Sequence, residues 1–171
     1  MKLLQTSILC FSLLSLIVAC SPEANNSKEF TINTVLTASG PLFEGSNTCQ
    51  AEISSNIAEY IKENGITKEQ IVDVTLTSAS ATIDTSNLNI LESINLQVFS
   101  DNFPMQNVAF ANVGDNNDKV DLEVADVQEQ LKAILFEGKS YIIADATIKE
   151  DLDDDLNLSM ELVFSINYHK K

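Results

Sequence analysis

Arginine and tryptophan are absent from this sequence of 171 residues, and all ten of its basic residues are lysines. Arginine is the side chain best suited to bind phosphates and carboxylates, because its planar guanidinium donates two parallel hydrogen bonds. A nucleic-acid partner also requires a basic surface, whereas this chain carries a net charge of −15 at pH 7. We therefore expect no nucleic acid among its partners.

Histidine occurs once, and the five glycines are scattered along the chain, which excludes several kinds of active site. A catalytic triad or a Cys–His pair needs a positioned imidazole, but His169 stands near the end of the chain and no motif surrounds it. A zinc site of the usual Cys/His kind lacks ligands, and no glycine-rich loop is present to hold a phosphate. We therefore expect that the protein is not an enzyme, and a hydrolase is the least favoured alternative.

The three cysteines allow no disulfide within the domain. Cys10 lies inside an apolar N-terminal segment, Cys20 ends that segment, and only Cys49 lies beyond it. Without a crosslink, the fold must be stabilised by its hydrophobic core. We predict that Cys49 is a small buried residue of that core, although pairing between molecules stays open if it is exposed.

The N-terminal segment is almost entirely apolar over residues 3–19 and follows a single positive charge at Lys2. It is shorter than the roughly 20 apolar residues of a transmembrane helix, and its charge and small final residue are those of a secretory signal peptide. The motif Ile17-Val18-Ala19-Cys20 resembles the lipobox of bacterial lipoproteins. The resemblance implies cleavage before Cys20, attachment of a diacylglycerol to its sulfur, and usually acylation of the new amine.

These features predict a signal peptide over residues 1–19, a flexible tether over residues 20–29 and one domain over residues 30–171. The tether is polar and contains Pro22. Two or three acyl chains suffice for stable anchoring where one does not. Ser21, rather than an aspartate, follows Cys20. In the lipoproteins that this motif resembles, that choice favours the outer membrane, at its periplasmic face or at the cell surface.

The domain mostly shows the alternation of apolar and polar residues that is typical of half-buried antiparallel strands. Leu156–Tyr168 is the clearest case. Residues 48–64 and a segment from Val127 to Gly138 instead place apolar residues at helical spacing, and Thr67–Gln70 and Asp126–Glu129 fit capping boxes. The pattern predicts a mainly β fold, an antiparallel, immunoglobulin-like β-sandwich with two short helices. The predicted strands are residues 30–38, 72–77, 90–100, 107–113, 120–124, 141–148 and 156–168.

The strand-rich part from Ile71 to Tyr168 also looks like the small immunoglobulin-like or late-embryogenesis-type β-sandwich domains of envelope lipoproteins. This resemblance rests on the strand pattern and not on a motif. It implies a fold and says nothing about function.

Acidic residues are densest in the turn before the last predicted strand. Ca²⁺ prefers several closely spaced carboxylate oxygens, although the spacing here does not match an EF-hand. Two interpretations stay open, a solvated turn and a weak Ca²⁺ site, and no other cofactor is expected. The candidate ligands are Glu150, Asp151, Asp153, Asp154 and Asp155, with Asp115 and Asp118 if their loop lies at the same end of the domain.

An apolar loop at Phe103-Pro104-Met105 either closes the end of the core or exposes a tip for a binding partner. Together with the lipobox and the missing catalytic residues, it favours a lipid-anchored envelope protein with a non-enzymatic binding or structural role. Its partners would be the membrane, through Cys20, and an unidentified envelope protein or ligand. A Ca²⁺-dependent binding module is the alternative.

Overall fold

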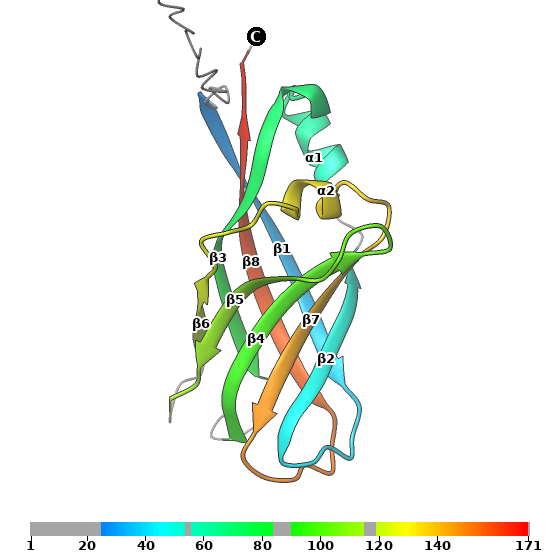
Figure 1. Ribbon diagram of the computed structural model, residues 1–171, viewed down its shortest axis with the longest axis vertical. Helices are drawn as coiled ribbons and strands as arrows, with labels where there is room; N and C mark the ends of the chain where they lie inside the picture. Colours follow the sequence, from blue (N-terminus) through cyan, green and yellow to red (C-terminus); the bar gives the residue numbers. More distant parts are fainter. Residues whose placement is uncertain (1–24, 54–55, 84–89, 115–118, 171) are drawn as a thin grey trace, which may run out of the picture.

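The computed structural model describes residues 25–53, 56–83, 90–114 and 119–170. Eight strands dominate this part of the chain, and two short α-helices and one 3₁₀ helix accompany them (Figure 1). The strands are β1 (Asn26–Ala38), β2 (Gly45–Ile53), β3 (Ile71–Ile83), β4 (Leu91–Ser100), β5 (Gln106–Asn112), β6 (Lys119–Val124), β7 (Ser140–Ile148) and β8 (Leu156–Tyr168); the helices are α1 (Ile57–Glu63), η1 (Lys68–Gln70) and α2 (Leu131–Leu135).

The strands form a closed antiparallel barrel in the order β1-β2-β7-β4-β5-β6-β3-β8. Strand β1 pairs with β8, β2 with β7, β3 with β6 and β4 with β5. The chain is therefore a long double-stranded ribbon that is rolled up on itself. This is the strand order of a jelly roll.

The predicted immunoglobulin-like sandwich is wrong, because its two sheets would have open edges. Here two four-stranded sheets, β2-β7-β4-β5 and β6-β3-β8-β1, are joined at both sides. The joints are narrow, since β1 and β2 pair only at Thr37 and Gln50, and β5 and β6 pair through two residues each. Alternation along a strand is the same in both architectures, so the pattern could not distinguish a closed ring from an open sandwich.

The two ends of the barrel differ. Neighbouring strands are all antiparallel, so the connections between strands lie alternately at the two ends. One end, here called the helical end, holds α1, η1, α2, the 101–105 loop, the start of β1 and the end of β8 (Figure 1). The connections 39–44 and 149–155 lie at the other, here called the acidic end.

The barrel interior is filled by apolar side chains from every strand and both α-helices. In β8 every second residue from Leu156 to Ile166 is buried, and the residues between them are polar except for Val163. The predicted strand 156–168 is confirmed residue for residue. Strand β1 begins at Asn26, inside the segment predicted as tether.

The predicted helix over residues 48–64 is wrong in its first half. Residues 45–53 form β2, which pairs with β7 along its whole length, and α1 begins only at Ile57. The inward positions of β2 before Ile53 carry the small residues Cys49 and Ala51, so its alternation was weak beside the helical spacing that follows. Gly65 ends the turn after α1 with a φ of 68°, as a left-handed residue should.

Of the two predicted capping boxes, the first is present and the second is wrong. The Thr67 backbone N–H donates to Oε1 of Gln70 at 2.8 Å, at the start of η1. The second box, Asp126–Glu129, does not cap a helix, because α2 begins only at Leu131 and Gln130 stands at its N-cap without a side-chain hydrogen bond. Within this segment, the Gln128 side chain accepts from the Leu76 backbone N–H at 2.6 Å and donates to the carbonyls of Leu76 and Ala125 at 3.1 and 2.7 Å. It thereby takes the place of a neighbouring strand where the pairing of β3 with β6 has not yet begun.

Replacing Gln128 with alanine should destabilise the barrel by about 2 kcal/mol, because it leaves the N–H and C=O of buried Leu76 without partners. Urea unfolding followed by circular dichroism measures this loss. Glu129→Ala, at the exposed neighbouring position, should change the free energy of unfolding by less than about 0.5 kcal/mol. Equal stabilities of the two variants would contradict the role of Gln128.

Candidate functional site

The acidic run folds against the loop after β1 and does not form a cluster of converging carboxylates. Leu42 and Leu152 form a two-way backbone pair with N–H to O distances of 2.7 and 2.9 Å. On either side of it, Asp155 Oδ1 accepts from the Gly40 backbone N–H at 2.9 Å, and Asp151 Oδ1 accepts from that of Glu44 at 2.8 Å. These carboxylates therefore serve as acceptors for backbone amides that no strand satisfies.

Only some of the predicted Ca²⁺ ligands lie in the described part of the chain. Asp115 and Asp118 lie outside the described residues. Within the described ranges, no group of three or more Asp, Glu, His or Cys side chains is placed to hold a metal ion. Asp153 and Asp154 are exposed in the turn. Ca²⁺ binding at this end stays a prediction, without a specific geometry to favour it.

Gly40 is where this loop packs most tightly. A Cβ added there would lie 2.6 and 2.7 Å from the backbone oxygens of Asp153 and Asp154, whereas one added at Gly138 would meet nothing within 4 Å. Only a hydrogen atom fits between these two loops at Gly40.

We expect Gly40→Ala to lower the free energy of unfolding by about 2 kcal/mol, since backbone atoms cannot move aside as a flexible side chain can. Gly138→Ala is the matched control and should be close to neutral. Thermal unfolding of both variants is the measurement. A Gly40→Ala protein as stable as the control would mean that loops 39–44 and 149–155 are not held as described.

Cys49 is fully buried on the inner face of β2, as predicted. Burial raises the pKa of its thiol to about 11, against a smaller opposing effect of a backbone hydrogen bond with Ala38. The thiol is therefore protonated and shielded at neutral pH, and neither catalysis nor pairing between folded molecules is open to it. His169 follows β8 at the helical end, and its backbone N–H donates to the carbonyl oxygen of Gln70 at 2.9 Å.

In a chain that starts at residue 20 and carries Cys20→Ala, Cys49 should fail to react with a thiol reagent until the protein unfolds. Its raised pKa also makes stability fall as the pH rises from 9 to 11, because the unfolded thiol ionises first. Denaturant unfolding across this range should show a smaller decline in a Cys49→Ala variant. Rapid labelling of the native chain would show that the barrel opens at β2.

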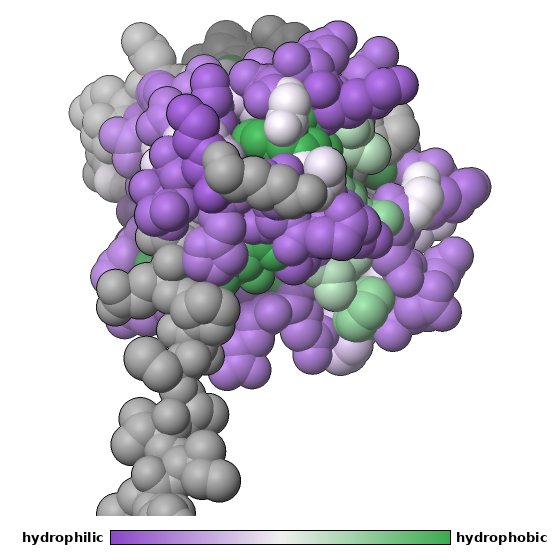
Figure 2. All heavy atoms as spheres, turned by 90° about the horizontal axis from the view of Figure 1, so that it is seen from above, coloured by the Kyte–Doolittle hydropathy of each residue, from purple (hydrophilic) through white to green (hydrophobic). Residues whose placement is uncertain are grey.

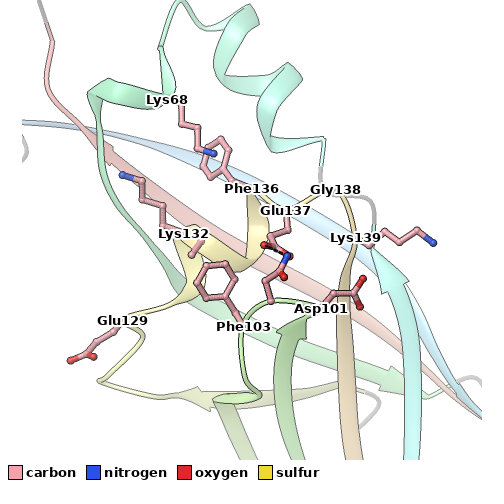
Figure 3. Close-up of a pocket in the computed structure, with 11 residues that line it drawn as sticks. Lys68, Asp101, Phe103, Glu129, Lys132, Phe136, Glu137, Gly138 and Lys139 are labelled. Carbon is pink, nitrogen blue, oxygen red and sulfur yellow. Dashed lines mark hydrogen bonds between the residues drawn. The ribbon is translucent and has the colours of Figure 1, made fainter.

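The helical end contains a cavity that sequence reasoning did not find. It has a volume of about 810 Å³ and lies between the 101–105 loop, η1 and the segment around α2 (Figure 3). Its apolar walls are Phe103 and Phe136, both half-buried against the core. Only one feature of the sequence indicated this cavity, the apolar loop at 103–105, because the residues that form its other walls are far apart in the sequence.

Charged side chains of both signs surround this cavity, and most of them are already engaged. The Lys68 ammonium stands 5.0 Å from the centre of the Phe136 ring, and Lys132 Nζ donates to the carbonyl of Ile71 at 2.6 Å. Glu137 accepts from the Asn102 amide at 2.9 and 3.2 Å. An aromatic cavity of mixed charge suits a ligand or partner that has both apolar and polar parts.

The apolar loop at 103–105 combines both of the predicted alternatives. Phe103 packs against the core and helps to close it. Met105 is 51% exposed, and Val127, which lines the same small hollow, is 66% exposed.

Comparison with known proteins adds little. No protein-family model matches the sequence, and no curated protein matches it. A structure of Desmodium yellow mottle tymovirus is 13% identical, with 88% of this chain and 93% of that chain covered and a TM-score of 0.34. One of turnip yellow mosaic virus is 12% identical, with 82% and 94% covered and a TM-score of 0.29. TM-scores this low support no conclusion, so the fold described above rests on the strand pairing alone.

Proposed function

We propose that the protein is a lipoprotein of the bacterial cell envelope, anchored through Cys20, whose barrel has a non-enzymatic binding or structural role. The motif Ile17-Val18-Ala19-Cys20 carries this proposal. These residues and Cys20 itself lie outside the described part of the chain.

The start of the barrel supports the proposal. Strand β1 begins at Asn26, so the residues between Cys20 and the barrel form a short link such as an anchored domain needs. Among the described helices, none is long and apolar enough to cross a membrane. Ser21 after Cys20 supports the outer membrane as the location of the anchor.

The features of the barrel support a binding or structural role over catalysis. Its sole histidine and its buried thiol lie in different places, and the thiol stays protonated at neutral pH. At the helical end, the surface offers the aromatic cavity and the exposed apolar pair Met105 and Val127. A partner that binds there would be an envelope protein or a small amphipathic ligand.

Replacing Cys20 with alanine should move the protein from the membrane fraction to the soluble fraction, and should abolish incorporation of labelled fatty acid. Cys49→Ala is the matched control and should keep both, because Cys49 is buried in the barrel. Membrane fractionation of bacteria that express each full-length chain is the measurement. Unchanged partition of the Cys20→Ala protein would rule out the anchor.

A further inference from the structure

The position of the chain's beginning restricts how an anchored barrel meets the membrane; this inference rests on the proposed lipidation of Cys20. Asn25, the first described residue, lies at the helical end, and Cys20 precedes it by five residues. A fully extended chain spans at most about 3.6 Å per residue, so the link reaches roughly 18 Å.

The barrel is longer than that link. Strand β1 has 13 residues, which at about 3.3 Å per residue run roughly 43 Å from the helical end towards the acidic end. With the lipid inserted, the barrel therefore cannot turn its acidic end onto the bilayer. The helical end, or a flank next to it, must stay within the roughly 18 Å reach of the link from the lipid.

One surface at the helical end is suited to that contact. Pro104 and Met105 from the loop before β5, together with Val127 from the segment before α2, surround a hollow of about 160 Å³ that Gln106, Glu129 and Gln130 also line. We call Pro104, Met105 and Val127 the apolar shelf. Figure 2 looks down on the helical end and shows apolar residues among hydrophilic ones there.

The exposure of apolar side chains on the shelf favours a lipid surface over continued contact with water. Met105 and Val127 are 51% and 66% exposed, although removing large apolar side chains from water lowers the free energy.

The charges around the shelf indicate which headgroups it fits. The neighbouring cavity is lined by Lys68, Lys132 and Lys139 but also by Asp101, Glu129 and Glu137, so charges of both signs stand there. Such a surface matches headgroups that carry both a phosphate and an ammonium group. The other end carries the Glu150–Asp155 run, which has five carboxylates within six residues.

We propose that the apolar shelf of the anchored protein rests on a bilayer of zwitterionic phospholipid, so that the acidic end points away from the membrane. Met105 and Val127 enter the headgroup region.

Site-specific quenching tests this orientation. The full mature lipoprotein is incorporated into phosphatidylethanolamine–phosphatidylcholine vesicles that contain a nitroxide-labelled headgroup lipid. A fluorophore is placed on Met105→Cys or, as the matched control, on Phe43→Cys, which is 68% exposed at the acidic end. Cys49 is buried and Cys20 is held in its thioether, so each variant offers a single accessible thiol.

We expect the label at position 105 to be quenched at least threefold more than the label at position 43. Adding Val127→Glu to the Met105→Cys protein should remove more than half of that quenching, because a charge replaces an apolar contact. Equal quenching at both positions, or quenching that Val127→Glu leaves unchanged, would overturn the proposal and leave the shelf for a protein partner or a second copy of this chain.

Flotation of the same vesicles separates this inference from the proposed function. A protein that floats with the vesicles but shows no preferential quenching is anchored without resting on the shelf, so only the orientation is wrong. A protein that does not float has no lipid anchor, and the proposed function fails together with the orientation.

Discussion

The pairing of β8 with both β1 and β3 is the interaction on which the rest of the barrel depends. Strand β8 pairs with β1 over all thirteen residues and with β3 over eleven register positions. Asn26 stands opposite Tyr168, so the first and last strands of the described chain are neighbours. Bringing Asn26 and Tyr168 together closes a loop that contains the whole barrel, and this costs conformational entropy. The burial of apolar side chains on the inner face of β8 offsets that cost. The pairing also brings both ends of the barrel chain to the helical end.

The three longest strands, β1, β3 and β8, extend beyond the barrel wall at that end, so the backbone groups along their outer edges need hydrogen-bond partners. Side chains supply these partners. Gln128 binds both backbone groups of Leu76, Lys132 donates to the carbonyl of Ile71, and the Tyr60 hydroxyl donates to that of Glu29. Exposed strand edges would otherwise pair with other chains. The segments that contain α1 and α2 thus protect the sheet, and the cavity around Phe103 and Phe136 lies beside them as a consequence.

The two ends consequently have different chemistry. At the acidic end, Asp151 and Asp155 hold loop 39–44 in place through its backbone amides. At the helical end, aromatic rings, lysines and exposed apolar side chains share one surface. An anchor at Cys20 would keep the helical end near the membrane and the acidic end away from it.

The sequence by itself determined the local features. Alternation placed seven of the eight strands and the exact limits of β8, and the cysteine count meant that the core had to stabilise the fold. Tertiary structure decided that residues 45–53 form a strand, that the sheets close into a jelly roll, and that the segment before α2 binds β3 through Gln128 rather than forming the predicted helix start at Asp126–Glu129. The reason is physical: alternation records which side of a strand is buried. Strand partners are chosen by hydrogen bonds between residues as far apart as Asn26 and Tyr168, and these leave no trace in the local pattern.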